Sequence, residues 1–343
     1  MEASKLEMVE VIGEGGNGCV YRGEYNKSIQ VAVKQLHRAQ DREAFLRELG
    51  YLKSIRHPNV ITLYGHVSTD DRELIVMELA SFSLAEALKN GYPMRKTLIW
   101  ASEAIRGLRC LHARNMAHMD IKPANILIDN NGVAKLGDLG LTCELKVGVA
   151  PEVDGGLVGT PAYMAPEQFQ RVLGKIDAPR VDRTAVDMYA VGMLLWEVSH
   201  RQKPVPSGWK LPMFIKQVAE NHWRPYIEED VPHALKTTIR MCTQADPNQR
   251  PNCSVVGGLL DKIAPSQIYS NYADQNFTYW ESEAKCFLSE GKFKREDDLS
   301  FSVHFADGQP SQVNIDPYNV LVEIEDLEHE LFEPRGTNSI QTI

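Results

Sequence analysis

The stretch HMDIKPAN at residues 118–125 gathers an imidazole, a carboxylate, an ammonium and an amide within one short run. Two short apolar runs follow at 125–129 (NILID) and 134–138 (AKLGD), and such runs between turn residues are typical of strands. One motif of this kind arises often by chance, so its weight depends on the motifs around it.

A glycine-rich run lies far upstream, where GEGGNGCV at 13–20 fits the pattern G-x-G-x-x-G-x-V. It falls between two predicted strands, whereas in a dinucleotide-binding unit the third glycine opens a helix. Without Cβ atoms, backbone N–H groups can fold closely over a polyphosphate. The run predicts a phosphate-binding loop, and a glycine-rich hairpin without a ligand is the alternative.

The predicted elements divide the chain into a β-rich first part and a mainly helical second part. The first part has apolar spacing typical of a helix at 41–55, with Asp41 as its N-cap. Strands are expected at 6–13, 19–25, 29–36, 60–67 and 73–80. Helices are expected at 83–89, 97–114, 185–199, 211–221 and 233–243. This order predicts two lobes with a cleft.

Further motifs keep a fixed order along the chain: VAVK at 31–34, Glu48, DLG at 138–140 and GTPAYMAPE at 159–167. With the two motifs above, the sequence resembles the eukaryotic-type protein kinase family, of the Ser/Thr type. HPNVITLYG at 57–65 and the segment 218–251 are similar to its tyrosine-kinase-like group.

The resemblance implies an α+β, bilobal protein kinase fold with a small β-rich N-lobe and a larger helical C-lobe. We expect the kinase domain at 5–264, with the N-lobe at 5–79, the hinge at 80–83 and the C-lobe at 84–264. Residues 265–343 would form a C-terminal extension.

The resemblance also assigns catalytic roles, with ATP and Mg²⁺ as the implied ligands. Lys34 would contact the α- and β-phosphates, and Glu48 would hold Lys34 through an ion pair. Glu43 is the competing candidate, but the apolar neighbours of Glu48 favour an inward face. Asp120 would be the catalytic base, with Lys122 beside the γ-phosphate. Oxygen ligands suit Mg²⁺, and the metal-binding residues would be Asn125 and Asp138.

Nucleotide binding is assigned by register within the family. The Glu78 carbonyl and the Ala80 amide would bond the purine edge, and Met77 would be the gatekeeper. The whole expected set is Ile12, Gly13, Gly15, Gly18, Val20, Ala32, Lys34, Met77, Glu78, Ala80 and Leu127.

Scaffold residues extend the resemblance. Thr160 would pack against Asp120 and Lys122, and Asp187 would anchor the backbone of the catalytic loop. Glu167 and Arg250 would form a buried ion pair.

Two positions depart from the family pattern. Met119 stands where most members have an Arg that pairs with a phosphate on the activation segment. The segment 138–167 contains no Ser, and its hydroxyls are Thr142, Thr160 and Tyr163. We therefore expect that activity does not require activation-segment phosphorylation. Leu139 replaces the usual Phe and keeps its apolar role.

Charge is concentrated at the end of the chain. The chain has 37 Lys+Arg and 46 Asp+Glu; residues 265–343 hold 5 and 15 of these, which leaves 32 and 31 for residues 1–264. A nearly neutral body argues against a nucleic-acid surface, which needs clustered basic residues.

The extension at 265–343 lies outside the resemblance. Its alternating residues at 301–305 and the run at 312–315 predict a β-hairpin, and NVLVEIEDLEHELF at 319–332 is either a strand leading into a helix or one acidic helix. We expect residues 333–343 to be disordered. The extension would be either a folded appendage or an acidic docking segment for a basic partner.

We expect a cytoplasmic protein with no membrane partner. No apolar run approaches the ~18 residues of a membrane span, and the first residues lack a secretory pattern. The six Cys residues show no C-x-x-C pair, so reduced thiols are expected.

The predicted function is an ATP-dependent serine/threonine protein kinase that acts on protein substrates. The alternative is a catalytically weak or inactive kinase-fold scaffold that docks partners through its acidic extension. Because Lys34, Asp120 and Asp138 are all present, the sequence favours the enzyme.

Overall fold

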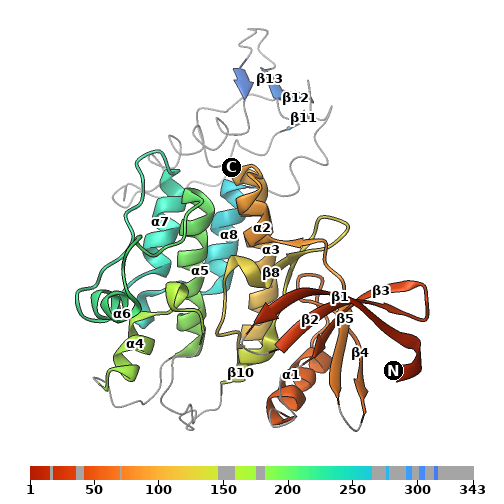
Figure 1. Ribbon diagram of the computed structural model, residues 1–343. Helices are drawn as coiled ribbons and strands as arrows, with labels where there is room; N and C mark the ends of the chain where they lie inside the picture. Colours follow the sequence, from red (N-terminus) through yellow and green to blue (C-terminus); the bar gives the residue numbers. More distant parts are fainter. Residues whose placement is uncertain are drawn as a thin grey trace. The chain divides into compact units, whose positions relative to one another are not determined.

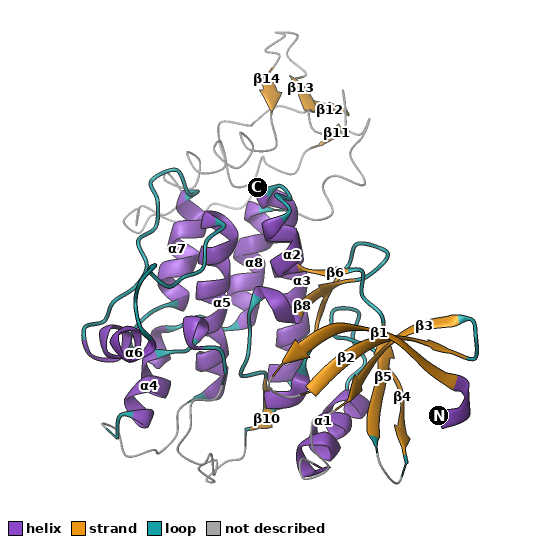
Figure 2. Ribbon diagram, viewed as in Figure 1, coloured by secondary structure: helices purple, strands orange, loops and turns teal. Residues whose placement is uncertain are grey.

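The computed structural model describes residues 1–15, 18–35, 42–69, 72–145, 159–174, 182–264, 276–277, 291–295, 301–305 and 313–315. The chain divides into two compact units, one comprising Met1–Tyr226 and Ile239–Gly257, the other Ile227–Thr238 and Gly258–Ile343. The first unit contains the β-rich part and most of the helical part (Figures 1 and 2). The predicted α+β fold is confirmed.

The β-rich part is an antiparallel five-stranded sheet in the order β1-β2-β3-β5-β4, accompanied by helix α1 (Arg42–Ser54). Its strands are β1 (Leu6–Gly15), β2 (Gly18–Tyr25), β3 (Ile29–Gln35), β4 (Leu63–Ser68) and β5 (Glu73–Glu78). Side chains alternate between the two faces of a strand. One face builds a core from Val31, Val33, Val67, Leu74 and Val76.

The helical part follows a short connection after β5. Its elements are β6 (Phe82–Ser83), α2 (Leu84–Lys89), α3 (Met94–His112), β7 (Met116–Ala117), β8 (Ile126–Ile128), β9 (Ala134–Leu136), β10 (Cys143–Glu144), α4 (Pro166–Val172), α5 (Arg183–His200), α6 (Leu211–Glu220), α7 (His233–Cys242) and α8 (Cys253–Ile263). Helix α5 is buried along most of its length. Its N-cap Asp182 accepts hydrogen bonds from the backbone N–H groups of Thr184 and Ala185, which stabilises the first turn.

Two small sheets frame the loop that contains Asp120. Strands β6, β8 and β9 form one sheet, and β7 pairs with β10 in the other. Asp120 lies between β7 and β8, and Asp138 lies between β9 and β10. Because β8 pairs with β9 and β7 pairs with β10, the two carboxylates lie in the same region of the fold.

Several boundaries differ from the sequence prediction. The strand predicted at 60–67 begins at Leu63, because Val60 forms a bridge to Leu136 and Ile61 N–H donates to the Leu136 carbonyl at 2.9 Å. Helix α3 begins at Met94, directly after Pro93, and helices α4 and α8 were not predicted. The predicted N-cap Asp41 lies outside the described residues.

In the second unit, strands β11 (Asn276–Phe277), β12 (Gly291–Arg295), β13 (Phe301–Phe305) and β14 (Val313–Ile315) form an antiparallel sheet. The segment predicted as a hairpin pairs Phe301 with Ile315 and Val303 with Val313. The predictions for 319–332 and 333–343 fall outside the described part of the chain.

Candidate active site

Strand register assembles the predicted nucleotide-binding face. Lys34 pairs with Val20 on β2 and with Ile75 on β5, and Ala32 pairs with Met77. Directly paired residues share a face of a sheet, and Lys34 is two residues from Ala32. These side chains therefore lie on the face opposite the Val31–Val33 core.

Lys34 is a buried ammonium that contacts two carboxylates, the buried Glu48 and the partly exposed Asp138. Its Nζ lies 2.7 Å from Glu48 Oε1, 2.8 Å from Glu48 Oε2 and 2.8 Å from Asp138 Oδ1. Burial alone would lower the pKa of Lys34, but the carboxylates of Glu48 and Asp138 outweigh it and raise that pKa. The ammonium therefore stays charged in a site with little water.

Glu48, not Glu43, is the carboxylate that reaches Lys34. Glu48 is buried on the inner side of α1, whereas the Glu43 side chain is 92% exposed and lies 3.8 Å from Arg47. The apolar neighbours of Glu48 in the sequence were therefore sufficient to predict that Glu48, and not Glu43, contacts Lys34.

Asp138 has the features of a metal ligand. Burial alone would raise the pKa of Asp138, but the Lys34 ammonium outweighs it and holds that pKa below its ordinary value. Asp138 adopts a left-handed backbone conformation, with φ of 54°, which turns the chain sharply after β9. An ionised carboxylate is thus held beside Lys34.

The Asp120 carboxylate accepts hydrogen bonds at both oxygens. Oδ1 accepts from the Thr160 amide at 3.0 Å and from the Thr160 hydroxyl at 2.8 Å. Oδ2 accepts from Lys122 Nζ at 2.6 Å and from Asn125 Nδ2 at 3.0 Å. Lys122 also donates to Thr160 Oγ1 at 2.8 Å. The carboxylate is therefore fixed in one orientation.

The Asn125 side chain fits a second metal-binding position. Its Nδ2 donates to the Asp120 carbonyl at 2.8 Å as well as to the Asp120 carboxylate, so its amide oxygen is directed away from Asp120. The backbone N–H of Gly137 donates to the backbone carbonyl of Asn125 at 2.8 Å, which links Asn125 to the residue before Asp138. Carboxylate and amide oxygens are ligands that suit Mg²⁺.

Asp187 on α5 holds the backbone in front of Asp120. Its carboxylate accepts from the amides of His118 and Met119, each at 2.8 Å. Met119 has a positive φ of 69°, which is uncommon for this residue type. The two bonds from Asp187 stabilise this conformation and so set the direction in which Asp120 leaves the backbone.

Of the other predicted nucleotide contacts, Gly13 pairs with Val20 and so shares the face of Lys34, whereas Glu78 pairs with Val31 on the core face. Glu78 ends β5, and Ala80 follows it in the connection to β6. Leu127 belongs to β8, Ile12 and Gly13 to β1, and Ile12 is exposed. Gly15 and Gly18 end and begin the strands of the glycine-rich hairpin; its tip, residues 16–17, lies outside the described residues.

Two further side chains beside the site, the buried Lys135 and the half-buried His112, were missed by the sequence analysis. Lys135 on β9 has its Nζ 3.3 Å from Glu78 Oε2 and 3.1 Å from the Pro58 carbonyl. His112, in the last turn of α3, has Nε2 2.9 Å from Asp187 Oδ2 and Nδ1 3.4 Å from Cys253 Sγ. The position of His112 near a helix C-terminus was the available signal, because that end favours a cation.

His112 should make stability depend on pH. Burial alone would lower the pKa of His112, but its bond to Asp187 outweighs this and raises the pKa from 6.5 to about 10. Because the folded state holds this proton more tightly, the stabilisation is present below pH 6.5 and is lost as pH rises toward 10. The expected slope is up to about 1.4 kcal/mol per pH unit.

Urea unfolding of the wild type and of His112→Gln across this range measures the effect. The free-energy difference between the two proteins should shrink as pH rises. A difference that stays constant over the range contradicts the assignment.

Comparison with known proteins agrees with this geometry. Residues 6–257 match the family model described as protein kinase domain. Dual specificity protein kinase shkC of Dictyostelium discoideum is 30% identical over 83% of this chain and 56% of its own length. Mitogen-activated protein kinase kinase kinase 7 of Homo sapiens is 29% identical over 80% of this chain and 46% of its own length.

The chain belongs to the protein kinase family, as the sequence analysis predicted. It spans about half the length of the curated relatives that it matches. None of the helices in the described part of the chain has the length and apolar character that crossing a membrane requires.

Proposed function

We propose that this chain is an ATP-dependent serine/threonine protein kinase with its kinase domain at 5–264. The observation that carries the proposal is the contact of one buried ammonium, Lys34, with both Glu48 and Asp138, which come from distant parts of the chain. A fixed positive charge beside an ionised carboxylate suits the polyphosphate of ATP.

In this proposal the residues divide the work of phosphoryl transfer. Lys34 binds the α- and β-phosphates, and Glu48 keeps its ammonium in place. Asp120 orients the substrate hydroxyl and takes its proton as the oxygen–phosphorus bond forms and the bond to the β-phosphate oxygen breaks. Lys122 stabilises charge on the transferred group. Mg²⁺, held by Asp138 and Asn125, would supply further neutralisation of phosphate charge.

Lys34→Met tests the proposal directly. Loss of a fixed charge at the reacting phosphates should reduce transfer of label from ATP to a generic basic protein by at least about 10²-fold. Lys53→Met is the matched control, because Lys53 is an exposed lysine on α1. Equal labelling by wild type and Lys34→Met rejects the proposal.

Specificity for Ser and Thr rests on Lys122. Its ammonium bridges Asp120 and Thr160, beside the carboxylate that would receive the hydroxyl. The relative shkC is named a dual specificity kinase, which supports action on Tyr as the second candidate. Phosphoamino acid analysis of the labelled protein separates the candidates, since phosphotyrosine beside phosphoserine and phosphothreonine favours the second.

We further propose that activity does not need a phosphate on the activation segment. Thr142 is buried, and the Thr160 hydroxyl is bonded to Asp120 and Lys122. The Tyr163 hydroxyl donates to Glu197 and is also buried. Phosphorylation at any of these hydroxyls would break existing packing, and Met119 offers a phosphate no positive charge.

Phosphatase treatment should therefore leave kcat within about twofold of its starting value, because the site is already assembled through Asp120 and Lys34. Thr142→Ala should behave like the wild type in the same assay. Loss of most of the activity on dephosphorylation of residues 138–167, detected by mass spectrometry, overturns this part of the proposal.

A further inference from the structure

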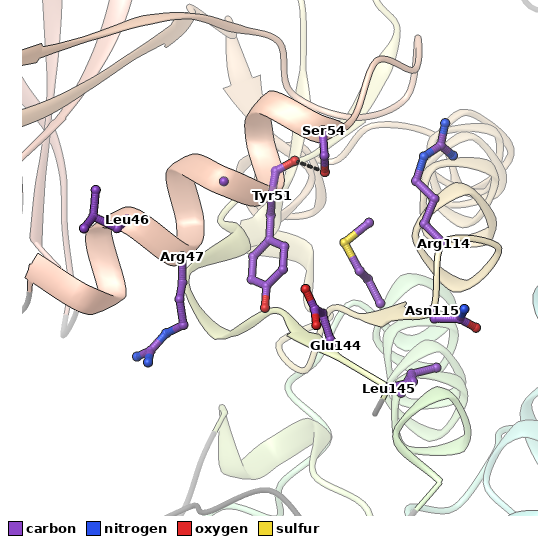
Figure 3. Close-up of a pocket in the computed structure, with 10 residues that line it drawn as sticks. Leu46, Arg47, Tyr51, Ser54, Arg114, Asn115, Glu144 and Leu145 are labelled. Carbon is purple, nitrogen blue, oxygen red and sulfur yellow. Dashed lines mark hydrogen bonds between the residues drawn. The ribbon is translucent and has the colours of Figure 1, made fainter. Parts of the chain in front are cut away.

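A cavity of about 810 Å³ lies beside α1, outside the site described above (Figure 3). Its walls come from α1, from the connection between α3 and β7, and from β10 with the residue after it. This volume is within the ~300–1,000 Å³ range of ligand sites. The cavity is therefore large enough to hold more than one side chain of a partner.

The walls of the cavity also carry the active-site residues. Helix α1 carries Glu48 on its buried side, and strand β7 leads directly into His118 and Asp120. Strand β10 pairs with β7, with Glu144 opposite Met116. An occupant of the cavity would touch the helix that positions Lys34 and the strand pair that flanks Asp120.

Gly50 lines this cavity in the middle of α1. A Cβ added there would meet no atom within 4 Å, and the residue has no positive φ. Neither sterics nor backbone conformation within the described chain requires glycine, and glycine destabilises the interior of a helix. A glycine at position 50 would be explained if another molecule approaches the backbone of α1 closely there.

Charge at the cavity favours an acidic occupant. Arg47 and Arg114 line it together with one carboxylate, Glu144. The Arg47 side chain is 64% exposed, with Glu43 3.8 Å away. Arg114, which follows α3, donates to the Cys110 carbonyl in the last turn of α3 at 3.1 Å and to Cys110 Sγ at 2.8 Å. Such local, exposed contacts are weak, so an acidic group can replace them at little cost.

Apolar and aromatic groups complete the lining. Leu46 is 53% exposed, although it is a large apolar side chain. Figure 3 shows the Tyr51 ring directed from α1 toward Glu144. Aromatic and Arg side chains around an apolar centre are the residues that contribute most to protein–protein binding.

We propose that this cavity is a docking site for an acidic segment of a partner protein, which inserts an apolar side chain over Gly50 between Arg47 and Arg114. The occupant bridges α1 and β10. Its effect on catalysis, through the position of Glu48, rests on the proposed kinase function; the binding itself does not.

Selection from a phage library of random dodecapeptides, with the full chain as bait, tests the docking site. The bait carries Asp120→Asn, so binding is measured independently of catalysis. Enriched peptides should combine Asp or Glu with Phe, Leu or Trp. Their synthetic forms should lose at least about tenfold in affinity on Gly50→Phe, which fills the cavity, and on Arg47→Glu.

Matched variants control for each change. Gly258→Phe places the same side chain at another open helical glycine, and Lys53→Glu reverses an exposed charge on α1 outside the cavity. Both should retain the affinity of the bait chain. The proposal is overturned if no peptides are enriched, if the enriched peptides are basic or lack acidic residues, or if Gly50→Phe and Arg47→Glu bind them as tightly as the bait. If Gly50→Phe does not fold, Arg47→Glu alone decides.

Discussion

Asp120→Asn should lower kcat by about 10²–10⁴-fold, because the amide cannot take the proton of the substrate hydroxyl. The surroundings add to the loss. Each Asp120 oxygen accepts two hydrogen bonds from donors on Thr160, Lys122 or Asn125. Whichever way the new amide turns, its NH₂ group faces two donors. Steady-state kinetics with ATP and a basic protein substrate measures the change.

The KM for ATP separates this effect from a general loss of structure. The Asp120 carboxylate accepts its hydrogen bonds from Lys122, Asn125 and Thr160, not from Lys34, which would bind the phosphates. KM for ATP should therefore stay near the wild-type value. Asp230→Asn, at an exposed Asp, should leave both parameters unchanged. A kcat for Asp120→Asn within about tenfold of the wild type would remove Asp120 from its proposed role.

Some features of the fold and the site could be predicted from residues that are neighbours in the sequence. The apolar run at 29–36 predicts a strand, and the structure has β3 there at Ile29–Gln35, with Val31 and Val33 in the core. The helical spacing of α1 distinguishes Glu48 from Glu43 because burial repeats every three to four residues. That these distant segments meet in one site could be predicted only from the order of the motifs and the family resemblance that it carries.

Long-range packing explains what the sequence did not reveal. The helix C-terminus near His112 favours a cation there, but it does not indicate the contact with Asp187, which is 75 residues away. Helix α8 contains Gly257 and Gly258, so its propensity is low, yet Val256 and Leu260 are fully buried. Tertiary packing outweighs propensity there. The sequence also does not show that a side chain at position 50 would meet no other atom, because that follows only from the folded structure.

The ion pair between Arg250 and Glu167 should have the largest effect on stability. Arg250 donates to both Glu167 oxygens, at 2.6 and 2.8 Å, and also to the Ala185 carbonyl at 2.9 Å. The Arg250 side chain has no exposed surface and the Glu167 side chain is 8% exposed. Removing one partner of such a pair leaves a buried charge without its counter-charge, which costs about 3–5 kcal/mol.

Arg250→Met should therefore lower the free energy of unfolding by about 3–5 kcal/mol in urea. Arg240→Met, at an exposed arginine near the end of α7, should change it by less than about 0.5 kcal/mol. Because the cost comes from the charge left behind, adding Glu167→Met to Arg250→Met should recover part of the loss. Arg250 also contacts the Ala185 carbonyl and lies over the Tyr189 ring, 5.2 Å from its centroid. If the double variant is as unstable as the sum of the two single variants, the loss comes from these contacts and not from the unpaired carboxylate.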